Sequence, residues 1–274
     1  ALSGSESDAQ YSDELREKCD RAEEVAAIVA NLGVAEEISV ATILCPLREA
    51  GLCSNAGIEE RFGPEVAALV GELERAGRFV LPRDWSPGQA LGADQAESLR
   101  KMLLAIVDDV RLVLVMLAEQ LHRLRSLKQA SESEQIRCAT ETREIYAPLA
   151  SRLGIWQFKW EMDDLAFRYL EPDTYKQIAR WLRERRTDRE QYIQRVVEVL
   201  SEALNDAGVI CEIAGRPKHI YSIYNKMLRK RLDFEHIFDV RAVRVLVNTP
   251  AECYAALGVV HGMWRYLPGE FDDY

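Results

Sequence analysis

The sequence predicts an α+β fold, in which a long all-α part is followed by a smaller part with a mixed sheet. Two observations predict it: apolar residues keep helical spacing to about residue 205, and strand signals begin only near Val209. A chain of 274 residues that is 48% apolar is long enough for more than one core. We expect a helical domain at 1–155, a helical connector at 156–190 and a sheet-containing domain at 191–274.

Helix signals occupy most of the chain before the sheet. Residues 1–12 are rich in Ser and acidic residues and are expected to fray. Gly77–Ala93 contains two prolines and several glycines, so it is predicted to be the longest loop. The predicted helices are Glu14–Leu32, Ile38–Ala50, Pro64–Arg75, Ala96–Val107, Val110–Lys128, Ser133–Ala150, Phe158–Tyr169, Pro172–Arg186 and Asp188–Asn205.

The last part of the chain alternates strand and helix signals. Val209–Ile213 is β-branched and lies between Gly208 and Gly215, which predicts a short strand. Phe238–Val247 has seven apolar positions out of ten and predicts a second strand. Helices are predicted after each strand, at Ile220–Arg231 and Ala251–Met263.

A candidate phosphate-binding segment lies between the first strand and its helix. A glycine turn at Gly215 that leads into a helix presents backbone N–H groups at the positive end of the helix dipole. Arg216 and Lys218 add positive charge there, and Ser222 and Lys226 share one helix face because they are four residues apart. The alternative is a basic surface loop followed by a solvated helix face.

Asp239 is a candidate ligand for a metal ion. It stands at the start of the second strand, and a carboxylate near a basic helix start is suited to Mg²⁺ bound to nucleotide phosphates. The alternative is an aspartate that pairs with Arg241 or caps a turn.

Charge is distributed unevenly along the chain, whose formal net charge is −10. Residues 1–150 hold 16 Lys/Arg against 26 Asp/Glu, whereas residues 151–274 hold 19 of each. An acidic chain is a poor candidate for broad binding to nucleic-acid duplexes through their phosphates. The six cysteines form no Cys-x-x-Cys pair, and no segment resembles a signal peptide or a membrane span. We therefore expect a cytoplasmic protein with reduced thiols and no membrane partner.

Four segments together resemble the RelA/SpoT family, and within it the synthetase-only RelA type. They are Lys101–Asp109 (KMLLAIVDD), Ile145–Ile155 (IYAPLASRLGI), Gly215–Lys226 (GRPKHIYSIYNK) and Phe238–Arg244 (FDVRAVR). The resemblance implies a GTP/GDP pyrophosphokinase that transfers pyrophosphate from ATP to the ribose 3′-oxygen of GDP or GTP. The product is (p)ppGpp, the alarmone of the stringent response.

The resemblance also implies roles for the residues singled out above. The ATP phosphates are expected on Arg216, Lys218, Ser222 and Lys226, with Mg²⁺ on Asp239. Such a transfer needs mainly alignment of two nucleotides and neutralisation of charge. The ribosome and tRNA are expected as partners only through C-terminal regions that lie beyond this chain.

The end of the chain carries an acidic group that is similar to synthetase-only relatives. Glu270, Asp272 and Asp273 are expected to recruit a metal near the acceptor nucleotide, or else to form a polar turn after Pro268 and Gly269. Family synthetases continue into segments that stack on guanine and supply the general base. The resemblance therefore implies only the N-terminal part of a synthetase domain, no catalytic base before Tyr274, and no turnover by residues 1–274 alone.

The all-α part is similar to an HD-type hydrolase domain that lacks its ligands. Hydrolase-competent relatives hold Mn²⁺ with two histidines and two aspartates, but the earliest of the four histidines here is His122. The resemblance places the ligands and their neighbours at six positions, and we do not expect the residues there to act as ligands. These residues are Arg21, Cys45, Pro46, Glu49, Ala50 and Glu119. We expect an inactive hydrolase domain without Mn²⁺. The alternative function is a regulatory pseudo-hydrolase module that binds nucleotide or protein without catalysis.

Overall fold

The computed structural model describes most of the chain. The backbone is described at residues 3–77, 109–184, 186–231, 241–265, 234 and 237. Side chains are not described at residues 1–12, 76–77, 184, 186–189 and 216–217. Most of the predicted loop Gly77–Ala93 and all of the predicted helix Ala96–Val107 lie outside the described residues. The chain divides into two compact units, Ala1–Glu171 and Pro172–Tyr274, which we describe separately.

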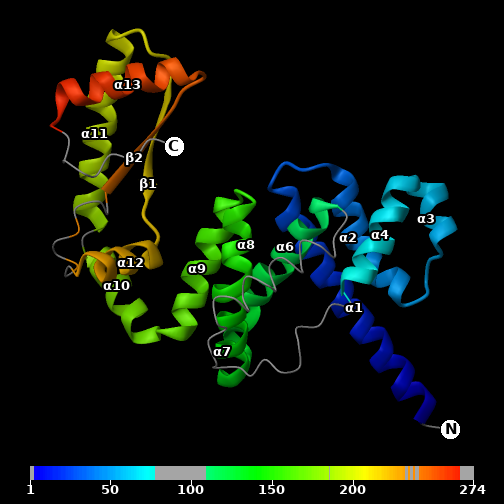
Figure 1. Ribbon diagram of the computed structural model, residues 1–274. Coiled ribbons are helices and arrows are strands. Elements are labelled where there is room, and N and C mark those ends of the chain that lie inside the picture. The colour runs from blue at the N-terminus through cyan, green and yellow to red at the C-terminus, as the bar shows by residue number, and fades with distance from the viewer. Residues whose placement is uncertain are drawn as a thin grey trace. The chain divides into compact units, whose positions relative to one another are not determined.

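The first unit is all-α in its described residues, as predicted (Figure 1). Its elements are α1 Ser3–Ala30, α2 Glu36–Glu49, α3 Asn55–Phe62, α4 Pro64–Gly77, α6 Val110–Ser126, the 3₁₀ turn Leu127–Gln129, α7 Glu132–Glu141, the π-helical turn Thr142–Tyr146, α8 Ala147–Arg152 and α9 Trp156–Leu170. The backbone is helical from Ser3, so the expected fraying of residues 1–12 is wrong there. Acidic residues stabilise the first turns of a helix through its dipole.

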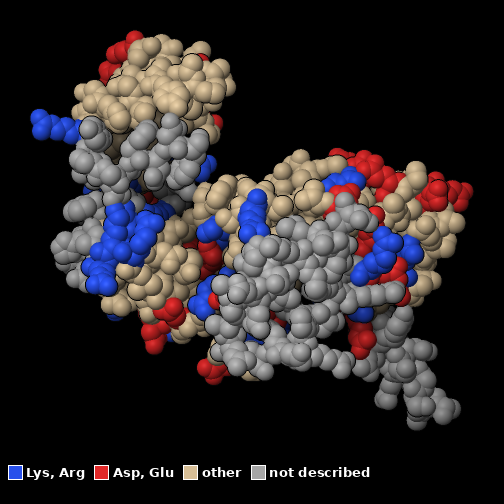
Figure 2. All heavy atoms as spheres, viewed as in Figure 1, with Lys and Arg blue, Asp and Glu red and all other residues tan. Residues whose placement is uncertain are grey.

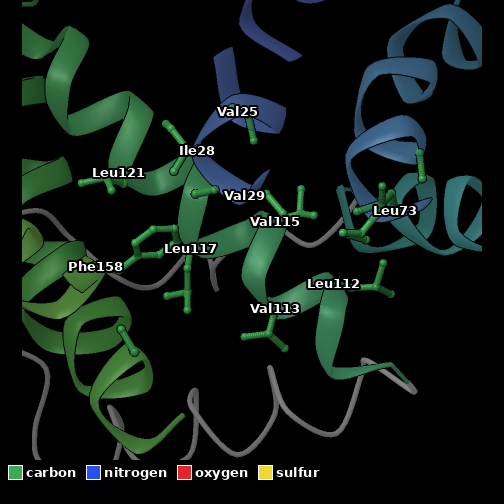
Figure 3. Packing of buried hydrophobic residues seen from close by; sticks show 14 of the residues in the cluster. Val25, Ile28, Val29, Leu73, Leu112, Val113, Val115, Leu117, Leu121 and Phe158 are labelled. Atoms are coloured by element: carbon green, nitrogen blue, oxygen red, sulfur yellow. The ribbon is translucent and has the colours of Figure 1, made fainter. Parts of the chain in front are cut away.

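Helix α6 runs through the hydrophobic core of the first unit. Leu117 is fully buried, and Leu121 is 1% exposed. Figure 3 shows side chains from other helices around this helix, including Val29 of α1, Leu73 of α4 and Phe158 of α9. The core therefore joins segments that are far apart in the sequence, and it fixes where the polar positions of α1, α2 and α6 lie.

The structure interrupts the predicted helix Ser133–Ala150 with the π-helical turn Thr142–Tyr146. The Gln120 side-chain amide of α6 donates to the Thr142 hydroxyl at 2.8 Å and to the Cys138 carbonyl at 3.3 Å. The Thr142 hydroxyl itself donates to the Cys138 carbonyl at 2.7 Å. These bonds satisfy polar groups inside the core, where leaving them unpaired is costly. The apolar pattern of the sequence does not reveal this network.

The second unit begins with two helices and continues into the predicted mixed part. Its elements are α10 Pro172–Glu184, α11 Arg186–Asp206, β1 Glu212–Pro217, α12 Ile220–Lys230, β2 Arg241–Leu246 and α13 Pro250–Met263. The strands pair antiparallel, with Gly215 opposite Val243 and Pro217 opposite Arg241. Helix α11 packs against both strands (Figure 1). The expected connector 156–190 contains α9 of the first unit and α10 of the second.

The structure confirms the helices predicted for this unit, but the first strand lies later in the chain than the predicted Val209–Ile213. Strand β1 starts at Glu212, and Gly215 lies inside it, so the predicted turn at Gly215 is wrong. Val209 instead packs beside Leu200 and Leu204 of α11 in the small core of this unit. The glycine is explained by close packing rather than by a turn: a Cβ there would lie 2.7 Å from the Cγ2 atom of Ile193.

Two other helices begin at capping residues whose side chains accept hydrogen bonds from the first turn. Thr249 caps α13, accepting from the Glu252 backbone N–H at 3.3 Å, and the Glu252 carboxylate accepts from the Thr249 N–H at 2.9 Å. Helix α3, which the apolar pattern missed, begins after Ser54, whose hydroxyl accepts from Gly57 N–H at 3.1 Å. Within the described ranges, none of the helices combines the length and apolar character that crossing a bilayer requires.

Candidate functional site

The candidate phosphate-binding segment joins the end of β1 to the start of α12 (Figure 1). Only Lys218 and His219 separate the two elements. His219 has extended backbone angles, with φ −67° and ψ 144°, and makes no side-chain capping hydrogen bond. Because the first N–H groups of a helix have no acceptor within the helix, a helix that starts in this way favours an anion at its N-terminus.

Three of the predicted phosphate ligands have described side chains, one just before α12 and two within it. Lys218, Ser222 and Lys226 are all half-buried, and Ser222 and Lys226 lie one turn apart on α12. Between them Ile223 is fully buried, which fixes the rotation of α12. Arg216 pairs through its backbone with Ala242 of β2, and its side chain is outside the described residues.

Not all positive charge near α12 belongs to this segment. Arg229, Lys230 and Arg231 lie at the opposite end of the helix and are exposed. Basic residues there compensate the negative end of the helix dipole, which gives them a structural role without any ligand. Figure 2 shows Lys and Arg gathered over the region of α10 and α12.

The expected metal-binding carboxylates lie outside the described residues. This applies to Asp239 and to Glu270, Asp272 and Asp273, so their roles stay predictions. Arg241, the alternative partner for Asp239, is described: its guanidinium carbon lies 4.6 Å from the ring centre of Tyr192 on α11. A cation over an aromatic ring is a favourable contact that accounts for Arg241 in its own right.

Four of the positions where the resemblance places hydrolase ligands or their neighbours come together in the first unit. We call the group of Arg21 on α1, Cys45 and Glu49 on α2 and Glu119 on α6 the α1–α2–α6 cluster. Cys45 Sγ lies 3.9 Å from Glu49 Oε1. Charges on Glu49 and Arg21 act on Glu119, and the charge on Glu119 acts on Cys45, so the four side chains share one electrostatic environment.

This environment keeps the Cys45 thiol protonated. The pKa of Cys45 is raised to about 12, first by burial and then by the charges of Glu49, Glu119 and Glu74, against a lowering by Arg48. The thiolate, rather than the thiol, is the nucleophile and the metal ligand, so without a metal ion Cys45 is in its unreactive form near neutral pH. The pKa of Glu119 is also raised, although the residue is exposed. The main cause is surrounding protein that displaces water, and the charge of Glu49 acts in the same direction. The charge of Arg21 lowers this pKa.

The two remaining positions named from the sequence, which lie outside the cluster, carry no metal-binding side chain. Pro46 is buried inside α2, and Ala50 is the residue that ends this helix. Nowhere in the described part of the chain do three or more His, Cys, Asp or Glu side chains gather as a metal ion would require. The earliest histidine, His122, links α6 to α1, because its Nε2 lies 2.9 Å from Glu24 Oε2.

Sequence reasoning missed Tyr146, which borders the same cluster. The pKa of Tyr146 is raised to about 12, first by burial and then by the charges of Glu141 and Glu119, while Arg123 lowers it. Tyr146 belongs to the π-helical turn, so only the tertiary structure brings it near Glu119.

Two family sequence models match the chain. Residues 6–156 match the family described as HD domain, and residues 215–274 match the family described as a region found in RelA/SpoT proteins. The first covers the helices that carry the α1–α2–α6 cluster. The second begins inside β1 and covers the candidate phosphate-binding segment.

Curated relatives extend this similarity to almost the whole chain. A protein of Photobacterium angustum named GTP pyrophosphokinase is 45% identical over 254 residues, covering 93% of this chain and 34% of its own. The protein of that name from Escherichia coli (strain K12) is 45% identical over 255 residues, with the same coverage. A Synechocystis protein named probable guanosine-3′,5′-bis(diphosphate) 3′-pyrophosphohydrolase is 42% identical over 251 residues, covering 91% and 32%. The chain thus spans about a third of the length of these relatives.

Proposed function

Because the chain belongs to the RelA/SpoT family, we propose that it serves a GTP pyrophosphokinase that makes (p)ppGpp. The β1–α12 segment binds the triphosphate of ATP, and the pyrophosphoryl group passes to the ribose 3′-oxygen of GDP or GTP. In this transfer the 3′-oxygen forms a bond to the β-phosphorus, the bond from that phosphorus to the α-phosphate oxygen breaks, and AMP leaves.

The observation that carries the proposal is the placement of Lys218 just before α12, Ser222 in its first turn and Lys226 one turn further along. An ammonium group and a hydroxyl near the positive end of a helix, followed by a second ammonium group along that helix, are groups that phosphate oxygens prefer. Bound Mg²⁺ would neutralise part of the triphosphate charge, and we propose Asp239 as its ligand and Arg216 as a further phosphate ligand from the sequence. Glu270, Asp272 and Asp273 are proposed to act near the acceptor nucleotide.

We further propose that the HD domain does not hydrolyse (p)ppGpp. The relatives named kinase and hydrolase are 45% and 42% identical to this chain, so overall similarity does not separate the two activities. The residues themselves support the proposal: the α1–α2–α6 cluster contains a protonated thiol and an arginine, and Pro46 follows the thiol, at positions where a metal site needs ligands. The cluster favours the second candidate function, a regulatory module without Mn²⁺.

Calorimetry with α,β-methylene-ATP and Mg²⁺ tests the phosphate-binding role. We expect the wild-type chain to bind and Lys218→Ala and Lys226→Ala each to weaken binding at least tenfold, about 1.4 kcal/mol or more. Lys176→Ala on α10 is the matched control, because its side chain is 76% exposed and its loss changes the net charge equally. If Lys176→Ala weakened binding of the ATP analogue equally, the effect would reflect only the change in net charge. That outcome would refute the assignment of Lys218 and Lys226 as phosphate ligands.

The other parts of the proposal have separate tests. We expect no (p)ppGpp synthesis by residues 1–274 alone in a radiolabelled ATP assay, and no Mn²⁺-dependent (p)ppGpp hydrolysis. Cytoplasmic location, and contact with ribosome and tRNA through other regions of a longer protein, are part of the same proposal.

A further inference from the structure

Two consecutive residues of α11 contact the end of the β1–β2 strand pair from which the phosphate-binding segment begins. A Cβ on Gly215 of β1 would lie 2.7 Å from Cγ2 of Ile193. Next to it, the Tyr192 ring carries the Arg241 guanidinium of β2 at 4.6 Å. Gly215 directly precedes Arg216, and Arg241 pairs with Pro217. The contacts therefore lie at the strand positions that immediately precede Lys218.

Gly215 is required by this contact rather than by its backbone conformation. Among the described residues, the glycines with positive φ are Gly33, Gly51, Gly63, Gly154 and Gly208, and Gly215 is not one of them. Alanine therefore fits the backbone of β1 but not the space beside α11. Ile193 cannot yield easily, because a β-branched side chain in a helix has one strongly preferred rotamer.

The two elements around Lys218 are anchored to different helices. Strand β1 packs on α11, whereas α12 packs on α10. Trp181 of α10 also stacks on Phe234, which follows α12, with ring centres 4.8 Å apart. Only two residues connect β1 to α12, so a shift of the strand on α11 moves Lys218 relative to Ser222 and Lys226.

We propose that Gly215, Ile193 and Tyr192 are positioning residues of the triphosphate site. By holding the end of the β1–β2 strand pair close to α11, they set the distance between Lys218 and the face of α12 that carries Ser222 and Lys226. The inference rests on the proposed function, because it concerns the geometry of that same site. A phosphate clamp loses affinity when its cationic groups are held away from their productive positions.

A double-mutant cycle tests the seat formed by Gly215 and Ile193. Gly215→Ala should weaken binding of α,β-methylene-ATP with Mg²⁺ about tenfold at unchanged stoichiometry, because the added methyl group pushes β1 away from α11. Ile193→Ala removes the Cγ2 atom, so the double variant Gly215→Ala/Ile193→Ala should return to within about twofold of Ile193→Ala alone. A pair of independent sites would give additive effects instead.

Tyr192 supplies a second variant pair that adds no clash. Tyr192→Phe keeps the aromatic face under Arg241 and should bind as the wild type does, whereas Tyr192→Leu should weaken binding about threefold. Stoichiometry separates positioning from unfolding, because a chain that only loses folded molecules keeps its dissociation constant and loses binding sites. This pair also decides the matter if Gly215→Ala does not fold.

The outcomes of these experiments separate the proposed function from the positioning role of Gly215, Ile193 and Tyr192. Absence of binding by the wild type overturns the proposed function and this inference with it. Binding that depends on Lys218 but is the same in Gly215→Ala, or weakened additively in the cycle, overturns the inference alone. Loss of stoichiometry without loss of affinity in the folded variants also overturns it.

Discussion

The β1–α12 segment and the α1–α2–α6 cluster both gather polar side chains, but their charge balance differs. In the segment, Lys218 lies at the start of a helix, where the dipole adds positive potential, and Lys226 lies further along the same helix. In the cluster, carboxyl groups and a thiol lie together, and Arg21 supplies positive charge from within the protein.

This difference separates a site that favours an external ligand from one that does not. Positive charge added to the positive end of a helix is stabilised by a bound anion. A cluster with its own cation has less to gain from a metal ion, and its thiol must also lose a proton before it coordinates. The same comparison explains why one half of the chain is proposed to be functional and the other degenerate.

The largest expected effect concerns Cys45. At pH 8 a thiol with a pKa of about 12 reacts roughly 10³-fold more slowly than one with an ordinary pKa near 8.5, because only the thiolate reacts. Mass spectrometry after iodoacetamide treatment measures this, with the exposed Cys253 as internal control. Rapid alkylation of Cys45, or its protection by added Mn²⁺, would contradict our description of the cluster.

A substitution in the core of the first unit should destabilise that unit without changing nucleotide binding by the second. Leu117 is fully buried in α6, so Leu117→Ala should lower the free energy of unfolding of the first unit by about 2–5 kcal/mol. The affinity of the second unit for the ATP analogue should not change. Urea unfolding followed by hydrogen exchange in each unit measures both; a parallel loss of nucleotide affinity would show that the site depends on the first unit.

Bound ligands should stabilise the second unit but not the first. At 100 times its dissociation constant, the Mg²⁺–ATP analogue should stabilise the second unit by about 2.7 kcal/mol, because only the folded state binds it. Mn²⁺ alone should leave the first unit unchanged. Hydrogen exchange at α12 and α6 reports the two responses, and protection of α6 by Mn²⁺ would reverse the comparison.

The smallest expected effect concerns Glu119. Its pKa is raised in the folded state, so the folded protein holds the proton more tightly, and stability falls as pH rises above the ordinary pKa of a glutamate. Glu119→Gln should remove this decline and stabilise the first unit at pH 7.5 by under about 1 kcal/mol, since the exposed side chain is screened by solvent. Urea unfolding at pH 5 and pH 7.5 measures it; equal destabilisation at both values would show that the carboxylate is needed for packing.

Local patterns in the sequence were sufficient for most of the architecture. The periodicity of α6 and of α12, and the capping residues of α13, act within a few turns of chain, so the sequence predicted these helices and the order of all-α and mixed parts. The spacing of Ser222 and Lys226 likewise follows from helix geometry alone. Their roles as phosphate ligands stay predictions.

Tertiary packing decided what depends on contacts between distant segments. The π-helical turn follows from Gln120 bonding across to Thr142, and the cluster forms because α1, α2 and α6 meet around one core. Gly215 shows the difference most clearly: in the sequence a glycine before a helix indicates a turn, yet the structure uses it as a strand residue beside Ile193. Sequence determined which elements form, because hydrogen bonds and periodicity act locally, and only tertiary structure decided which backbone must approach which side chain.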